Sequence, residues 1–149
     1  MGKILLIGGI GAGKTSLKQM LMNEKVGYRK TQTLDFSRLF VDCPGEYLEI
    51  PRFYHVLISA SYQVSEIWAL QDATKQRTFY PPKFVKVFNK PVIGIVTKTD
   101  LPKSNIEQAV TYLTYAGITE PIYQTSTVCE EGLAPLRMRL EALDELRGR

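Results

Sequence analysis

The sequence is short of cysteine and histidine, the residues from which most zinc and disulfide sites are built. Its 149 residues contain two cysteines, Cys43 and Cys129. They are too far apart for a CxxC pair and too few for a zinc site, so both are expected to be reduced thiols. The single histidine, His55, has no Cys, His or Asp companion at ligand spacing. A metal centre built on these residues is therefore excluded.

Long apolar runs and blocks of like charge are also missing. No stretch approaches the roughly 20 apolar residues of a membrane span, and the early apolar run, Ile4 to Ile7, is followed by glycines and by no cleavage site. It predicts a buried strand in a cytoplasmic protein rather than a secretory signal. The formal net charge of +4 is modest, and no Arg-rich stripe with interleaved aromatics occurs. We therefore expect no membrane span and no nucleic-acid partner.

What the chain does contain is an ordinary globular composition. Hydrophobic residues make up 44% and charged residues 23% of the sequence, close to the averages of folded domains. No internal repeat, linker or low-complexity tract divides it. Residues 1–149 are therefore expected to form a single domain around one core.

Short apolar runs alternate with helical patterns along the chain. Strands are expected at residues 3–7, 39–41, 64–70, 92–97 and 122–124, and helices at 15–22, 53–61, 84–88, 106–116 and 133–146. This alternation predicts right-handed βαβ crossovers and a mostly parallel sheet between helices. The expected fold is α/β, a three-layer α/β/α sandwich.

The strongest motif lies between the first expected strand and the first expected helix. It reads Gly8-Gly9-Ile10-Gly11-Ala12-Gly13-Lys14-Thr15, which matches GxxxxGK[ST], the P-loop. Glycines let backbone N–H groups point at phosphate oxygens, and the helix N-terminus adds partial positive charge. Lys14 is expected to bridge the β- and γ-phosphates and the Thr15 hydroxyl to bind Mg²⁺, with Ser16 completing the nucleotide site.

A second motif, DxxG, runs from Asp42 to Gly45 at the end of an apolar strand. The Asp42 carboxylate is expected to reach Mg²⁺ through water. The Gly45 N–H is expected to bond the γ-phosphate.

A third motif, Thr97-Lys98-Thr99-Asp100, follows the expected strand at 92–97, at the edge where ligands bind in open α/β sheets. Asp100 can accept two hydrogen bonds from guanine that adenine cannot offer, and the stem of Lys98 can stack on the base. Ser126, after the last expected strand, can offer a backbone N–H to the guanine O6. These residues predict GTP, with ATP as the alternative.

The order of these motifs resembles that of the Ras-like small GTPases over essentially the whole chain. In detail, Lys30-Thr31-Gln32-Thr33 and Asp42-Cys43-Pro44-Gly45-Glu46-Tyr47 resemble the EutP/PduV family of ethanolamine- and propanediol-utilisation P-loop proteins. The resemblance implies that the protein associates with a bacterial microcompartment, with a shell protein as its partner.

The sequence departs from the Ras-like pattern around the γ-phosphate. Either Thr31 or Thr33 should be the switch threonine that reaches Mg²⁺ and the γ-phosphate. Few residues separate them from Asp42, so the second strand of the Ras-like fold must be shortened or missing. Glu46 replaces the water-orienting glutamine and is either a general base or a solvent-facing residue, with Glu49 a weaker candidate for the same role.

Two further departures concern partners and affinity. The β-branched Ile10 would crowd the route of an arginine supplied by a partner. Thr97 replaces the commoner asparagine and lacks its second hydrogen-bonding group, which predicts somewhat weaker nucleotide affinity.

Three functions follow as hypotheses. The first is a slow, Mg²⁺-dependent GTPase switch. The second, which the resemblance implies because some members of that family are associated with acetate kinase activity, is an ATP-dependent acetate kinase. No dedicated acetate-binding arginine is evident, although Arg29, Arg38 or Arg52 could approach the γ-phosphate. The third is a shell-docking module in which hydrolysis is incidental.

Overall fold

The computed structural model describes residues 3–26, 39–119, 121–126 and 131–147. Its centre is a five-stranded sheet in the order β2-β1-β3-β4-β5, in which every neighbouring pair is parallel. The strands are β1 (Ile4–Ile7), β2 (Phe40–Asp42), β3 (Glu66–Asp72), β4 (Val92–Thr97) and β5 (Ile122–Gln124). The expected α/β fold with a parallel sheet is confirmed.

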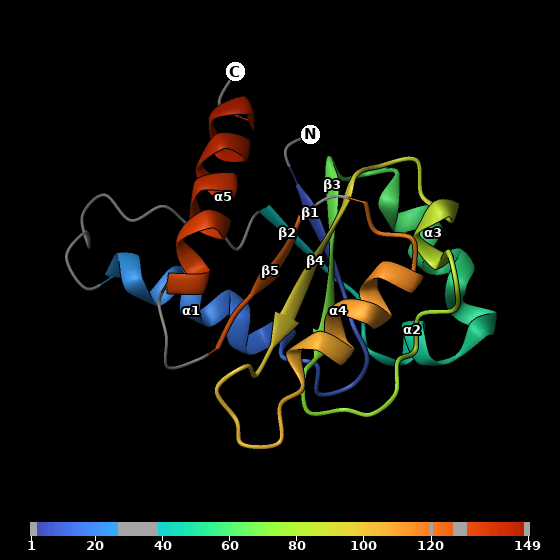
Figure 1. Cartoon of the computed structure of the whole chain (residues 1–149). Helices are drawn as coiled ribbons and strands as arrows, with labels where there is room; N and C mark the ends of the chain where they lie inside the picture. Colours follow the sequence, from blue (N-terminus) through green and yellow to red (C-terminus); the bar gives the residue numbers. More distant parts are fainter. Residues whose placement is uncertain (1–2, 27–38, 120, 127–130, 148–149) are drawn as a thin grey trace.

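Helices cover both faces of this sheet. The α-helices are α1 (Lys14–Val26), α2 (Glu46–Glu49), α3 (Tyr54–Ser61), α4 (Ile106–Tyr115) and α5 (Ala134–Arg147), and short 3-10 turns are η3 (Pro51–Phe53), η4 (Phe84–Val87) and η5 (Glu131–Leu133). Helices α1 and α5 lie on one side of the sheet, and α2, α3 and α4 lie on the other (Figure 1).

Alternate residues of each strand feed two separate cores. In β1, Leu5 and Ile7 pack into the cluster that includes α3 and α4, whereas Ile4 and Leu6 pack into the cluster that includes α1 and α5. Period-two alternation with apolar residues on both faces is what a sheet between two helical layers requires. The structure is therefore a three-layer sandwich. Residues 8–13, which carry the P-loop motif and which we call the phosphate loop, lie at the carboxyl edge of its strands.

The central strand β3 differs from its expected position. It runs from Glu66 to Asp72 rather than over 64–70, and all of its residues are buried. Its polar ends are tolerated because each is paired: Glu66 accepts from Trp68 Nε1 at 2.6 Å and from Arg139 Nε at 2.9 Å, and Asp72 is held at the other end by Thr74. Trp68, fully buried, is a core residue.

The segment after the DxxG motif, where the sequence predicted no helix, contains α2. The expected helix at 53–61 also divides into the 3-10 turn η3 and the helix α3. The second strand of the Ras-like pattern, with Thr31 and Thr33, would fall at residues 27–38, outside the described ranges. Among the described helices, none is long and apolar enough to cross a membrane.

Candidate functional site

The phosphate loop joins β1 to α1 at the carboxyl edge of the sheet. Gly11 and Gly13 have φ angles of +77° and +103°, in the left-handed region that glycine enters at least cost. Ala12 N donates to Gly9 O at 3.1 Å, and Leu17 N donates to Gly13 O at 2.9 Å. These two backbone hydrogen bonds, one within the turn and one in the first turn of α1, therefore hold the loop in shape.

Lys14, the first residue of α1, is folded back over this loop. Its Nζ donates to Gly8 O at 2.8 Å and to Gly9 O at 3.3 Å. Beside it lies a cavity of 260 Å³, which we call the phosphate cradle. The lining residues are Gly11, Ala12, Gly13, Lys14, Thr15, Ser16 and Lys98. Backbone N–H groups, two lysines and two hydroxyls suit a polyphosphate, and the Thr15 hydroxyl suits Mg²⁺.

The DxxG segment packs directly on the loop. A β-carbon built on Gly45 would lie 2.5 Å from Ile10 N, so no side chain fits there. One turn later, Glu49 Oε2 accepts a hydrogen bond from Ile10 N at 2.6 Å. Glu46, by contrast, is exposed. Of the two acidic candidates, Glu49 is therefore the one that touches the phosphate loop.

The structure describes only part of the other residues that the sequence predicted around the γ-phosphate. Asp42 ends β2 opposite Leu6 of β1, but its side chain is outside what the structure describes, as are Thr31 and Thr33. Ile10 is 59% exposed. Its side chain lines the cavity next to α2, and its effect on an approaching arginine stays a prediction.

Lys98 joins the third motif to the phosphate loop. The residue has a φ of +62°, and its Nζ donates to Gly11 O at 2.8 Å and lies 2.9 Å from Asp72 Oδ2. Lys98 lines both the phosphate cradle and a narrow cavity of 60 Å³ beside α1 that also includes Thr97 and Ser126. This narrow cavity is the position expected for a nucleotide base.

Thr97 makes a second connection to the loop. It is 5% exposed, and its Oγ1 donates to Ala12 O at 2.7 Å. The Thr97 hydroxyl thus ties the end of β4 to the phosphate loop. Thr99 Oγ1 donates to Thr125 O at 3.0 Å, which holds the third motif against the segment that carries the buried Ser126. Asp100 is exposed and does not line the narrow cavity.

Asp72, which the sequence did not single out, holds Lys98 in place. Burial alone would raise the pKa of its carboxyl, but hydrogen bonds from Thr74 and Lys98 and the charge of Lys98 outweigh burial, so the pKa lies below its ordinary value. Thr74 donates to Asp72 Oδ1 through its N at 2.8 Å and its Oγ1 at 2.6 Å. No sequence motif marks Asp72, because its partner is 26 positions away in the chain.

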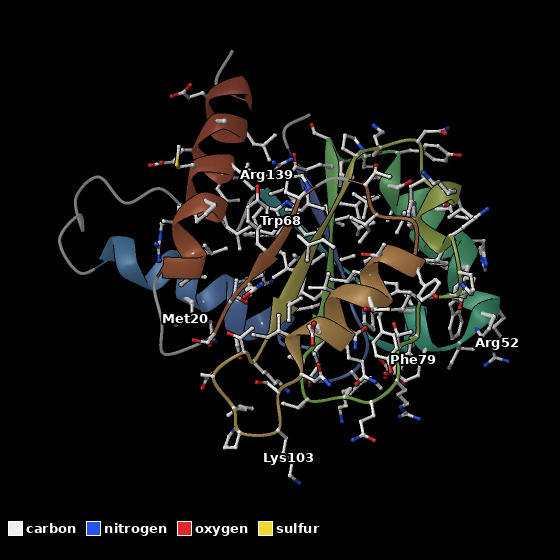
Figure 2. The ribbon with its side chains drawn as sticks, viewed as in Figure 1. Met20, Arg52, Trp68, Phe79, Lys103 and Arg139 are labelled. Carbon is white, nitrogen blue, oxygen red and sulfur yellow. The ribbon has the colours of Figure 1, made fainter. Side chains whose placement is uncertain are left out.

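A second cavity of 260 Å³, which we call the side cavity, opens on the other side of the phosphate loop. Its walls come from the loop, α2, the end of β3 and the segment 75–80. The lining residues are Gly9, Ile10, Ala12, Leu48, Glu49, Leu70, Gln71, Asp72, Lys75, Arg77, Thr78, Phe79 and Tyr80. Phe79 lies beside α2, whereas Arg52 lies at the outer edge of the molecule (Figure 2). Arg52 does not line the cavity.

His55, the single histidine, does not belong to a metal site in the part of the chain that the structure describes. His55 is exposed, with its Nδ1 2.9 Å from Arg52 O. Within the described residues, no group of three His, Cys, Asp or Glu side chains could hold a metal ion.

Comparison with known proteins identifies relatives of this chain. A family model described as ethanolamine utilisation and propanediol utilisation (PduV-EutP) matches residues 1–142. The propanediol utilization protein PduV of Citrobacter freundii is 34% identical over 143 residues, 95% of each chain. A "Probable acetate kinase EutP" of Salmonella typhimurium is 31% identical over 147 residues, 97% of this chain and 92% of that one. An Escherichia coli protein of the same name is 30% identical over 129 residues, 85% of this chain and 81% of that one.

Proposed function

This chain belongs to the PduV-EutP family of ethanolamine and propanediol utilisation, and we propose that it binds GTP with Mg²⁺ and hydrolyses it slowly as a molecular switch. The observation that carries the proposal is the joining of two motifs that are far apart in sequence. Thr97 bonds the carbonyl of Ala12, and Lys98 bonds the carbonyl of Gly11. A phosphate-binding loop and a base-binding motif in direct contact suit one ligand that carries both a base and phosphates.

The roles follow from the contacts. Lys14 leaves the carbonyls of Gly8 and Gly9 to engage the β- and γ-phosphates, and the backbone N–H groups of the phosphate cradle hold their oxygens. Thr15, and Asp42 through water, would hold Mg²⁺, which would neutralise charge at the phosphates. Lys98 orients the base, since it borders both the phosphate cradle and the narrow cavity. The recognition of guanine by Asp100 rests on the sequence motif alone, because Asp100 does not line the narrow cavity.

Slow hydrolysis is supported by what lines the phosphate cradle. None of its lining residues is an arginine, and the residue that replaces the water-orienting glutamine, Glu46, is exposed. Without an arginine at the developing charge, P-loop enzymes turn over slowly. The family's role supports a bacterial microcompartment as the place of action, with a shell protein as the partner that reads the bound nucleotide.

A second candidate is an ATP-dependent acetate kinase. It is supported by the names of the Salmonella and Escherichia coli relatives and by the side cavity next to the phosphate loop. Phosphoryl transfer to an acceptor needs a second binding site beside the γ-phosphate, and the side cavity supports such a site because Gly9 and Ile10 of the phosphate loop line it.

The test is nucleotide affinity and turnover with Mg²⁺, for GTP and ATP, with and without acetate. The wild type is compared with Lys14→Ala, Asp100→Ala and the control Lys103→Ala, an exposed lysine on the same loop as Asp100. Tighter GTP binding that is lost in Asp100→Ala and kept in Lys103→Ala, with phosphate release independent of acetate, supports the switch. ATP preference with acetyl phosphate formation replaces it with the kinase.

A further inference from the structure

We propose that one surface at the amino edge of the sheet binds an acidic segment of a partner protein. This surface consists of Lys83, Lys86 and Lys90 with the exposed side chains of Val87 and Tyr115, and we call it the lysine surface. It lies apart from the phosphate loop, so the inference goes beyond the proposed function and does not depend on it.

Positive charge is concentrated in one stretch of the chain. Residues 73–99 contain no Asp or Glu and six cations, Lys75, Arg77, Lys83, Lys86, Lys90 and Lys98. Because the formal net charge of the whole chain is +4, the rest of the chain is net negative. Lys98 pairs with Asp72. Lys75 and Arg77 line the side cavity, and the carboxylates of Glu49 and Asp72 line it too. The other three lysines belong to the lysine surface.

The short turn η4 and its flanking residues are divided between the core and the solvent. Phe84 and Phe88 are buried, and their ring centroids are 5.7 Å apart. Lys83 and Lys86 are exposed, and Val87 is 48% exposed. The buried rings therefore hold the lysines at fixed positions on the surface.

The backbone of this turn is also joined to the end of α4. Lys83 N donates to Tyr115 O at 2.7 Å, and Val85 N donates to Ala116 O at 3.0 Å. Lys83 has a φ of +59°, a left-handed conformation that costs a lysine about 1 to 3 kcal/mol and that the bond to Tyr115 helps to maintain. Tyr115 is 69% exposed. A surface that is fixed in advance loses less entropy on binding than a flexible one.

A hollow of 160 Å³ has Lys86 and Lys90 in its lining. Val85, Phe88 and Ile118 supply its apolar part. A cavity of about 150 Å³ holds one benzene ring. The hollow therefore has room for one aromatic or branched aliphatic side chain from a partner, with an ammonium group on either side of it.

The carboxylates of the described residues leave the charge of these lysines uncompensated. None of them pairs with Lys83, Lys86 or Lys90. Lys90 Nζ donates to Val64 O at 2.8 Å, but a carbonyl is neutral. Glu66, which begins β3 at the same edge of the sheet, pairs with Arg139 of α5 on the opposite face.

A peptide segment with carboxylates on both sides of one apolar side chain complements the lysine surface. The carboxylates pair with the lysines and speed the encounter, and the apolar side chain enters the hollow. The phosphates of a nucleic acid or of a lipid membrane offer the same negative charge but no side chain for the hollow. The hollow therefore favours a protein segment over these two polyanions.

The lysine surface and the nucleotide site lie at opposite ends of β4. Lys90 and Pro91 directly precede this strand, whereas the phosphate loop lies at the carboxyl edge of the sheet. At about 3.3 Å per residue, the six residues of β4 separate the two by about 20 Å. Binding of the acidic segment should consequently be the same with and without nucleotide.

The test uses fluorescence anisotropy of labelled synthetic peptides with the full chain. Each peptide has glutamates on both sides of one phenylalanine, and the spacing between them varies across the set. The wild type is compared with a double variant, Lys83→Gln with Lys86→Gln, and with Lys103→Gln, an exposed lysine on the loop between β4 and α4. Loss of two exposed ion pairs should weaken peptide binding about fivefold or more, with Lys103→Gln unchanged.

Two further results are expected for the same peptides. Replacing the phenylalanine of the peptide with alanine should weaken binding about fivefold or more, because the hollow then stays unfilled. Raising the salt concentration should weaken binding by wild type more than by the double variant, because salt screens exposed charges.

The proposal is overturned if no peptide of the set binds the wild type, or if wild type and double variant bind equally. Tighter binding of duplex DNA or of phosphatidylserine vesicles, lost in the double variant, overturns the choice of a protein segment. Self-association that the double variant abolishes, measured by analytical ultracentrifugation, replaces the partner with a second copy of this chain. Circular dichroism verifies the fold of the variants. A failure to bind GTP would overturn the proposed function and leave peptide binding as it is.

Discussion

The carboxylate of Glu49 accepts a hydrogen bond from the backbone N–H of Ile10 at 2.6 Å, across 39 positions of the chain. This N–H belongs to the phosphate loop, and we expect it to donate to the terminal phosphate when a nucleoside triphosphate binds. Glu49 and a nucleoside triphosphate therefore compete for one donor, and their negative charges repel. Binding of the triphosphate should release the end of α2 from the loop.

Glu49→Gln should consequently bind a non-hydrolysable GTP analogue more tightly, by about three- to tenfold, because a neutral amide competes less well for the N–H. GDP affinity should change little, since GDP lacks the terminal phosphate. Isothermal titration calorimetry with Mg²⁺ measures both, with Glu107→Gln, an exposed glutamate on α4, as the control. Equal effects on GTP and GDP would show that Glu49 does not compete with the phosphate.

Gly45→Ala should destabilise the protein by about 1 to 3 kcal/mol, because overpacking shifts backbone. The new β-carbon would lie 2.5 Å from Ile10 N. The φ of Gly45 is −57°, which alanine adopts readily, so the whole effect is steric. Urea unfolding measures it, and a stability equal to that of the wild type would mean that the DxxG segment is not packed on the loop as described.

Thr97→Val should remove the bond to Ala12 O and leave that carbonyl without its donor, at a cost of about 1 to 3 kcal/mol. Nucleotide affinity should fall with it, because the phosphate loop loses its connection to β4. Thr111→Val is the control, since the Thr111 hydroxyl is exposed and bonds only within α4. Its unfolding free energy should stay within about 0.5 kcal/mol of the wild type. Unchanged stability and affinity in Thr97→Val would contradict this role.

Asp72 should contribute to acid sensitivity. Its pKa in the folded state is lowered below the ordinary value of 3.8, so its stabilising effect is fully present above that value and is lost as pH falls through the folded-state pKa. Asp72→Asn should therefore flatten the loss of stability below about pH 4 while loosening Lys98. Chemical unfolding at a series of pH values tests this, and an acid limb as steep as that of the wild type would refute it.

Glu66→Gln should weaken folding and spare the nucleotide site. Glu66 is 8% exposed and bonds Arg139 through both of its oxygens, at 2.9 and 3.2 Å. Trp68 and Arg139 lie close together between the sheet and α5 (Figure 2). Replacing the charge should cost about 1.5 to 3 kcal/mol, while GTP affinity stays constant, since Glu66 begins β3 at the end far from the phosphate loop. A large loss of affinity would mean that the two ends of the sheet are coupled.

The sequence predicted those helices and strands that are marked by an uninterrupted apolar run or by helical periodicity. The five strands are marked by apolar runs, and β4 and β5 have their predicted bounds. The helix α2 was missed because its four residues are too short for helical periodicity and follow Pro44 and Gly45, which predict a turn.

The residues of the candidate site likewise differ in whether the sequence could predict them. The phosphate loop could be predicted because its motif consists of consecutive residues. Asp72 and Glu49 cannot be found in this way, because each acts through a partner that only the folded chain brings near. Glu49 was rated below Glu46, which directly follows the motif, yet packing of α2 turns Glu49 to the loop. Sequence adjacency to a motif is thus a weaker guide than the helix register that follows it.

The ties from Thr97 and Lys98 to the phosphate loop span 85 and 87 positions, and this separation has a consequence during synthesis. The glycine-rich motif is complete by residue 15, but the loop is held in shape only after β3 and β4 have paired beside β1. Contacts so distant in sequence form late, since the intervening chain must first be ordered. A nascent chain should therefore acquire GTP affinity only once Lys98 has left the ribosome, so that nucleotide binding marks the moment at which this topology is achieved.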